Sequence, residues 1–313
     1  MHEFAVYSTQ PETHFRVISN KKSSIEHRNL NELIQERIKG EKRFFGIEIS
    51  PSPTGRNLDY NCFGDLQPLF TSITWLFDHN IICEPISNAP AIALTRSVNE
   101  CNPALLHLTC YELSNAKLQE IIDNGVTNFF ALRGDLESAE QPWKFAIDLV
   151  KAIRQIKCDA TIGVAGYPEI HRTAISAMED LKNLKAKVDA GADFIITNTC
   201  FNIHKLTEFI RSCRSIGITV PIIPGIYVPT SFAEMTQMCE ICNVIVPAQQ
   251  MEIFQRYQHD NELFGKFAIE NATEFIGKLF AFDFERIPGV HFFTLNKYEH
   301  IVKVVQNCDF TNQ

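Results

Sequence analysis

Residues 128–136 have the sequence NFFALRGDL, an apolar run that ends in an arginine, a glycine and an aspartate. A short, continuous apolar run is typical of a strand buried on both faces of a parallel sheet. Barrel enzymes place their functional groups at the carboxyl ends of such strands. The stretch therefore predicts a parallel α/β sheet with a site at the ends of its strands.

Two further stretches have the same form, an apolar run followed by polar residues. Residues 105–110 have the sequence LLHLTC, and residues 163–171 have the sequence GVAGYPEIH. The Arg-Gly-Asp triplet at 133–135 would mean little alone, because a surface turn explains most such triplets. Three strand ends that carry polar residues favour a shared site.

Short apolar or β-branched runs alternate with helical patterns along the chain, as in parallel βα units. Eight strands are predicted, at residues 43–50, 69–75, 104–110, 128–135, 160–168, 194–201, 220–226 and 290–296. Amphipathic segments lie between them at residues 115–125, 143–156, 177–191 and 204–217. Three of these segments close on a glycine in the position that ends a helix. The pattern favours a closed (β/α)8 TIM barrel over an open sheet.

The ends of this pattern predict the domain organisation. A leading helix is expected at residues 30–39 and a closing helix at 298–307. Residues 1–40 would then form an N-terminal extension with the leading helix, and residues 41–313 a single barrel domain. The interval 247–284 has a helical pattern and would add helices before the last strand. The connection 51–68 has little helical character.

Composition and charge exclude several classes of protein. The chain has 313 residues, of which 45% are hydrophobic and 21% charged, and its net charge is −8. This acidic balance argues against a nucleic-acid or anionic-membrane partner. No apolar stretch is long enough to span a membrane, and none has the form of a secretory signal. We therefore expect a cytoplasmic protein.

The ten cysteines are spread without the spacing of a disulfide framework, and we expect free thiols. Cys239 and Cys242 form the one close pair. A redox motif would need a thioredoxin-like context, and a zinc site would need a second pair nearby. Both cysteines are therefore expected on a helix face, and no metal site is predicted.

Polar side chains at the ends of the predicted strands would meet at one end of the barrel. They are Glu48, Thr74, Trp75, His107, Thr109, Arg133, Asp135, Tyr167, His171, Thr197, Asn198, Tyr227, Asn296 and Lys297. Glu48 lies in an otherwise apolar strand, where a structural ion pair and a solvated strand end are the alternatives to a catalytic role. Burial would raise its pKa toward the range of a general acid at neutral pH.

Several segments between residues 44 and 307 occur together in one enzyme family. They are SITW at 72–75, HLTC at 107–110, ALRGD at 131–135, AGYP at 165–168 followed by His171, AGADFIIT at 190–197, IPGI at 223–226 and HFFTLN at 291–296. In these motifs the chain resembles the catalytic domain of the 5,10-methylenetetrahydrofolate reductases. The resemblance implies a TIM barrel that reduces 5,10-methylenetetrahydrofolate to 5-methyltetrahydrofolate, with NADH or NADPH as hydride donor.

The resemblance also implies a non-covalent FAD, bound without the glycine-rich loop of Rossmann proteins, and no such loop occurs here. The positions that would contact FAD are Thr74, His107, Arg133, Gly134, Asp135, Phe145, Ala146, Tyr167, His171, Ala174, Asp180, Asn183 and Lys187. Arg133 and Lys187 would suit the anionic pyrophosphate or the polar ribityl chain. For Lys187, a solvated helix face is the alternative.

The family's catalytic and substrate positions map onto four residues. Glu48 would be the acid that opens the imidazolidine ring of the folate. Asp135 would tune hydride donation by the flavin through its negative charge, and it would hydrogen-bond the amide edge of the pterin. The alternative is that Asp135 caps the next helix. Asn198 and Lys297 would complete the substrate-binding set. Nicotinamide preference stays open, because no ribose-phosphate motif is visible.

The sequence also departs from the family. Asn198 stands where a glutamine is usual, and Lys297 where an arginine is usual, so both polar contacts are altered. The S-adenosylmethionine-binding regulatory domain of many relatives has no counterpart after the barrel in this sequence, so we expect no feedback through it. A homodimer or homotetramer is expected.

Two other classes of protein stay open. One is a flavin- or folate-binding barrel of the same fold that has lost turnover, which the change at Asn198 suggests. The other is a pterin-binding transferase that uses no flavin. Flavin colour in the purified protein would exclude the transferase, and bleaching by a nicotinamide nucleotide would exclude the inactive binder.

Overall fold

The fold is described by a computed structural model, which covers residues 17–19, 29–51, 58–75, 85–136 and 141–311. The main strands are β2 (Phe44–Ile49), β4 (Phe70–Ile73), β5 (Ala104–Thr109), β6 (Asn128–Leu132), β7 (Thr161–Gly166), β8 (Phe194–Thr199), β9 (Ile222–Tyr227) and β10 (Gly289–Phe293). They form a closed barrel in the order β10-β2-β4-β5-β6-β7-β8-β9, and every neighbouring pair is parallel. The predicted TIM barrel is confirmed.

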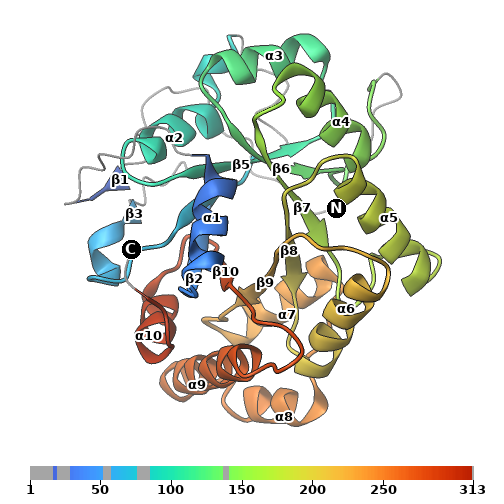
Figure 1. Cartoon of the computed structure of the whole chain (residues 1–313). Helices are drawn as coiled ribbons and strands as arrows, with labels where there is room; N and C mark the ends of the chain where they lie inside the picture. The colour runs from blue at the N-terminus through green and yellow to red at the C-terminus, as the bar shows by residue number, and fades with distance from the viewer. Residues whose placement is uncertain (1–16, 20–28, 52–57, 76–84, 137–140, 312–313) are drawn as a thin grey trace, which may run out of the picture.

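Helices surround the strands as an outer layer (Figure 1). They are α1 (Leu30–Lys39), α2 (Pro90–Asn99), α3 (Asn115–Asp123), α4 (Ala146–Ile156), α5 (Ala177–Asp189), α6 (Ile203–Ser215), α7 (Phe232–Cys242), α8 (Ala248–Arg256), α9 (Asn261–Phe280) and α10 (Glu299–Asn307). Two short strands, β1 (Val17–Ile18) and β3 (Leu58–Asp59), pair beside the barrel. No helix in the described part of the chain is long and apolar enough to cross a membrane.

The sequence pattern located the eight barrel strands, each within one to three residues of its observed ends. The glycines expected to end helices do so: Gly125, Gly191 and Gly217 adopt φ values of 87°, 117° and 83°. The pattern did not identify α2, and it gave no bounds for α7, although Cys239 and Cys242 were expected on a helix face. Most of the predicted N-terminal extension lies outside the described residues.

The barrel interior is a packed core. Alternate residues of the strands point inward and form one apolar cluster, which includes Phe44, Phe70, Phe130, Phe194 and Ile223. The outward residues form a second, larger cluster against the helices. Because the interior is filled, a ligand can be held only at one of the two ends.

Helix α1 lies across the end of the barrel at which the strands begin (Figure 1). Leu30 and Ile34 are fully buried and belong to the interior cluster. The Leu30 amide donates to the side chain of Asn128 at 3.3 Å, and the Thr161 hydroxyl donates to the side chain of Asn29 at 2.7 Å. Asn128 and Thr161 are the first residues of β6 and β7. The helix is therefore fixed to the amino-terminal end of the barrel.

Candidate active site at the carboxyl end of the barrel

A cavity of about 590 Å³ opens among the carboxyl ends of the strands and the helix α7. Its volume lies in the range of small-molecule sites. The polar side chains that line it are Glu48, Thr74, His107, Asp135, Tyr167, His171, Arg172, Thr197, Asn198, Glu234, Gln237 and Asn243. Eight of the predicted strand-end residues, namely Glu48, Thr74, His107, Asp135, Tyr167, His171, Thr197 and Asn198, are thus brought together here.

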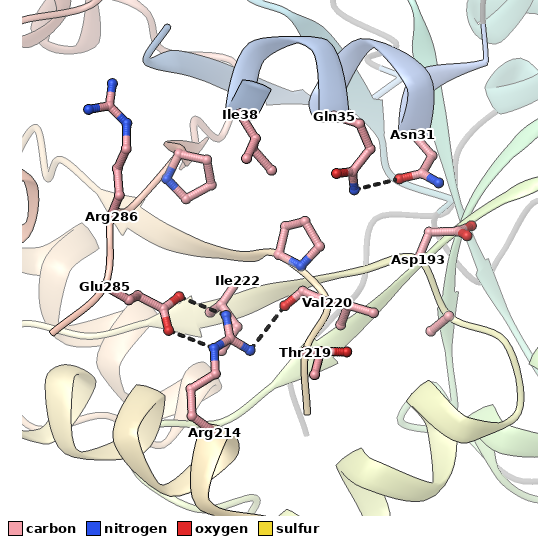
Figure 2. Close-up of a pocket in the computed structure, with 13 residues that line it drawn as sticks. Asn31, Gln35, Ile38, Asp193, Arg214, Thr219, Val220, Ile222, Glu285 and Arg286 are labelled. Atoms are coloured by element: carbon pink, nitrogen blue, oxygen red, sulfur yellow. Dashed lines mark hydrogen bonds and ion pairs between the residues drawn. The ribbon is translucent and has the colours of Figure 1, made fainter. Parts of the chain in front are cut away.

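A second cavity, of about 460 Å³, lies at the opposite end beside α1 (Figure 2). Its wall contains Arg214 and Glu285, which face each other in a two-bond ion pair of 2.6 and 2.7 Å. Asp193 is likewise paired with Arg154 at 2.6 Å. Since these charges satisfy one another, they stabilise the fold and offer little to a ligand. We therefore assign the functional site to the carboxyl end, where barrel enzymes have theirs.

Glu48 carries the carboxyl group at the floor of the site. It is the fifth residue of β2, and its side chain is directed into the cavity with 8% of the residue exposed. Burial raises the pKa of Glu48 to about 8, because desolvation penalises the charged form. The carboxyl is therefore mostly protonated at neutral pH and is able to donate a proton.

His107, on β5, presents an unpaired nitrogen in the site. The residue is 7% exposed, its ring lies 4.9 Å from the ring of Phe130, and Nε2 has no hydrogen-bond partner among the described residues. Burial lowers the pKa of His107 to about 3, so the imidazole is neutral. A buried polar atom without a partner costs free energy unless a ligand or water satisfies it. This nitrogen therefore fits a site for a polar ligand edge.

The loop after β6 begins with the Arg-Gly-Asp triplet. Gly134 adopts a φ of 85°, which a side chain would disfavour, and this turn separates its two neighbours. Asp135 is exposed and lines the cavity, whereas Arg133 lies outside the lining and donates from Nε to the Gly134 carbonyl at 3.3 Å. The triplet thus brings a negative charge to the cavity rim.

Tyr167 and His171 follow β7 and pack edge to face, with ring centroids 4.6 Å apart. Burial raises the pKa of Tyr167 to about 12, so its hydroxyl stays protonated. Burial is also the largest cause of the lowered pKa of His171, and the neighbouring Arg133 acts in the same direction. The His171 amide donates to Asp180 at 3.0 Å, which ties this loop to α5. The pair thus offers two neutral polar side chains.

Lys187 lies on α5, behind β7. Its ammonium group donates to the carbonyl of Ala165 at 2.7 Å, and Ala165 itself lines the cavity. Burial lowers the pKa of Lys187 to about 8, and the nearby Asp180 opposes this shift. The Lys187 side chain therefore points toward the barrel wall at Ala165, and the expected alternative of a fully solvated helix face does not describe it.

Eight of the positions expected to bind FAD do not line the cavity. They lie after β6 and β7 and on α4 and α5, and they are Arg133, Gly134, Phe145, Ala146, Ala174, Asp180, Asn183 and Lys187. Phe145 at the start of α4 is 58% exposed. A ligand that contacted both the cavity lining and these eight positions would extend from the cavity across the α4–α5 side of the barrel.

Asn198 and Lys297, the altered positions, are held by protein groups. Asn198 lines the cavity, but its Nδ2 donates to the Cys242 carbonyl at 3.0 Å and its Oδ1 accepts from the Thr199 amide at 2.9 Å. Lys297 does not line the cavity, and its ammonium group binds the carboxylate of Glu234 and the hydroxyl of Thr230, the latter at 3.3 Å. Neither side chain projects freely toward a substrate.

Helix α7 supplies a wall of the site that sequence reasoning missed. Glu234, Gln237, Met238, Ile241 and Cys242 all line the cavity, and their spacing places them on one face of the helix. A local signal existed, since Ser231 is followed three residues later by a glutamate. The Ser231 hydroxyl does accept from the Glu234 amide, at 3.3 Å.

The cysteines within the described ranges are not gathered into a metal site. All those in the described residues are free thiols, and Cys239 and Cys242 lie on α7 as expected. Burial raises the pKa of both thiols to about 11, so both stay protonated at neutral pH. In the same part of the chain, no group of three or more His, Cys, Asp or Glu side chains is placed to hold a metal ion.

Comparisons with known proteins agree with this architecture. A solved structure of an uncharacterized protein from Clostridium thermocellum that binds two copies of 5-methyl-5,6,7,8-tetrahydrofolic acid has a TM-score of 0.60 and 13% identity, over 88% of this chain and 98% of that one. At this identity the likeness supports the barrel fold alone.

Similarity in sequence is greater. The chain is 30% identical over 295 residues to a probable methylenetetrahydrofolate reductase (NADPH) of Caenorhabditis elegans, covering 89% of this chain and 44% of the relative. It is 36% identical over 204 residues to the 5,10-methylenetetrahydrofolate reductase of Escherichia coli K12, covering 62% and 66%. The chain thus spans less than half of the first relative and 66% of the second. The family model for methylenetetrahydrofolate reductase matches residues 34–309, and the chain therefore belongs to this family.

Proposed function

We propose that the chain reduces 5,10-methylenetetrahydrofolate to 5-methyltetrahydrofolate, with NADH or NADPH as donor and a non-covalently bound FAD. Family membership supports the reaction, and relatives named for NADH and for NADPH support a nicotinamide donor. The relatives named methylenetetrahydrofolate reductase support a folate ligand. The observation that carries the proposal is the buried, protonated carboxyl of Glu48 in a cavity at the strand ends.

The residues present fit a flavin. Nε2 of His107, a residue of the cavity lining, is buried and has no hydrogen-bond partner among the described residues, and a bound flavin would satisfy it. Thr74, Tyr167 and His171 add neutral polar groups, and Lys187 and Arg133 add positive charge on the α4–α5 side. The bound flavin would supply hydride transfer, which no side chain provides. These groups would hold and orient it.

Glu48 would act as the proton donor. Opening the imidazolidine ring of the folate requires a proton on the departing nitrogen, and the carboxyl of Glu48 is kept protonated at neutral pH by its burial. Asp135 at the rim would accept hydrogen bonds from the pterin amide edge, and its negative charge would disfavour a fully anionic reduced flavin. The site would thus separate an acid at its floor from an anion at its rim.

Spectroscopy of the purified protein tests the proposal. We expect a yellow protein with the visible flavin band, which NADH or NADPH bleaches under anaerobic conditions and methylenetetrahydrofolate restores. A colourless protein that takes up no added FAD would favour the flavin-free transferase. A flavin band that neither nucleotide bleaches would favour a binding protein without turnover.

A further inference from the structure

Helix α7 forms one wall of the cavity with a single face. The lining positions 234, 237, 238, 241 and 242 are spaced by three or four residues, as in one stripe of a helix. Met235 is its one fully buried residue, and Phe232, Met238, Cys239 and Cys242 pack against the core while partly exposed. Polar contacts at its end add to this apolar packing.

The end of α7 is bound by polar groups. The last carbonyl groups of a helix lack partners within it. Here the Cys239 carbonyl accepts from the Val244 amide at 3.0 Å, and the Glu240 carbonyl accepts from the Asn243 amide at 3.4 Å. The next two are bound by side chains of other barrel units: Arg172 donates to the Ile241 carbonyl, and Asn198 to the Cys242 carbonyl at 3.0 Å.

Arg172 lies in the loop that follows β7, and Asn198 lies near the end of the neighbouring strand β8. A guanidinium at a helix C-terminus also interacts favourably with the negative end of the helix dipole. The Asn198 amide is fixed from both sides, because its oxygen accepts from the Thr199 amide. Both residues line the cavity, and their side chains bind the end of α7.

Two side-chain amides of this part of the lining, Gln237 on the helix and Asn243 directly after it, have no hydrogen bond to another described residue. The carboxylate of Glu234 is held by Lys297 and Thr230. Gln237, one turn further along the lining stripe, is exposed, and no hydrogen bond of its side chain to another described residue is found. A side-chain amide both donates and accepts, so it matches the carboxamide of a nicotinamide or the lactam edge of a pterin.

We propose that Arg172 and Asn198 are positioning residues that fix the end of α7 at the cavity, and that Gln237 presents the side-chain amide to a substrate carrying a carboxamide or lactam edge. The assignment of the substrate rests on the proposed function. With Gln237 in this role, α7 would provide the amide contact that the family resemblance places at the end of β8. The shorter amide at position 198 is then sufficient, because Asn198 binds the Cys242 carbonyl and does not need to reach the substrate.

Hydrogen exchange of the purified holoprotein tests the anchor without reference to activity. Arg172→Gln and Asn198→Ser should each speed exchange of the amides at 240–246 by about tenfold, the factor that corresponds to about 1.4 kcal/mol for one lost hydrogen bond. Arg172 is exposed, so its variant is expected to fold even if Asn198→Ser does not. Arg256→Gln, at an exposed position on α8, is the matched control. Exchange unchanged in the folded variants would overturn the anchor.

Kinetics test the amide. Gln237→Leu should raise KM about tenfold for either the nicotinamide or the folate and leave kcat within about twofold. The substrate whose KM rises shows whether Gln237 binds the nicotinamide carboxamide or the pterin lactam. Gln249→Leu, at an exposed position on α8, should change neither constant. Unchanged KM values for both substrates in Gln237→Leu would overturn this role. Should the wild type prove inactive, the proposed function fails. Calorimetric titration of 5-methyltetrahydrofolate and of NAD⁺ into Gln237→Leu then decides the amide contact, with unaltered affinities overturning it.

Discussion

His291 Nε2 lies 3.0 Å from the hydroxyl of Ser72, the residue that pairs in register with Glu48. The His291 ring is fully buried and stacks on Phe70, with centroids 5.4 Å apart and planes 7° apart. Burial lowers the pKa of His291 to about 3, and the neighbouring His107 acts in the same direction. A neutral, hydrogen-bonded pair therefore lies beside the strand that carries the proposed acid.

This pair predicts acid sensitivity. The folded-state pKa of His291 is lowered from an unfolded value near 6.5, so its contribution to the free energy of unfolding is complete above pH 6.5 and falls as the pH drops toward 3. His291→Leu should flatten this part of the stability curve. At pH 7 the same change should cost about 1–3 kcal/mol, because the Ser72 hydroxyl loses its imidazole partner. Urea titrations from pH 3 to 7 measure both effects, and an unaltered slope would argue against a buried neutral imidazole.

The raised pKa of Glu48 predicts the opposite dependence at high pH. The carboxyl is protonated below its pKa of about 8 and loses its proton above it, so the folate half-reaction should slow as the pH passes 8. The free energy of unfolding should change in the same direction as the pH rises. The carboxyl of Glu48 ionises more easily in the unfolded chain, so a higher pH favours unfolding. The free energy of unfolding should fall between pH 4.5 and 8. Stopped-flow rates of flavin reoxidation by methylenetetrahydrofolate, measured on both sides of pH 8, test the first expectation, and urea titrations between pH 4.5 and 8 test the second.

Replacing the acid should separate the two half-reactions. Glu48→Gln keeps the shape of the side chain and removes the proton, so the folate half-reaction should slow by about 10²–10⁴-fold while flavin reduction by NADH or NADPH is largely preserved. Glu252→Gln, on the exposed face of α8, is the control. An equal loss in both half-reactions would show that Glu48 shapes the site and donates no proton.

Lys187 and His171 should matter for flavin retention. Lys187→Ala or His171→Ala should each weaken FAD binding by about 1–3 kcal/mol if each makes one charge-assisted or hydrogen-bonded contact. Lys182→Ala, an exposed lysine on the same helix, should have no effect. Flavin fluorescence during dilution reports the dissociation constant. Folded variants that bind FAD as tightly as the wild type would assign Lys187 to the Ala165 carbonyl alone.

Much of the barrel could be predicted, because buried strands and amphipathic helices leave local patterns. The bounds of α7 were missed, although Cys239 and Cys242 were expected on a helix face, because a helix that buries only one residue fully carries a weak apolar pattern. The surroundings of the site residues could not be predicted. Asn198 meets its partner 44 residues away and Lys297 meets Glu234 63 residues away, and such pairings are set by the closed barrel.

The docking of α1 has a consequence for synthesis of the chain. Leu30 and Asn29 bind side chains that lie 98 and 132 residues further along. At ribosomal rates of about 5–20 residues per second, the apolar face of this helix must wait on the order of ten seconds for the strands that cover it. During that interval Leu30 and Ile34 are exposed, and the nascent chain is open to chaperones or to aggregation through its first helix.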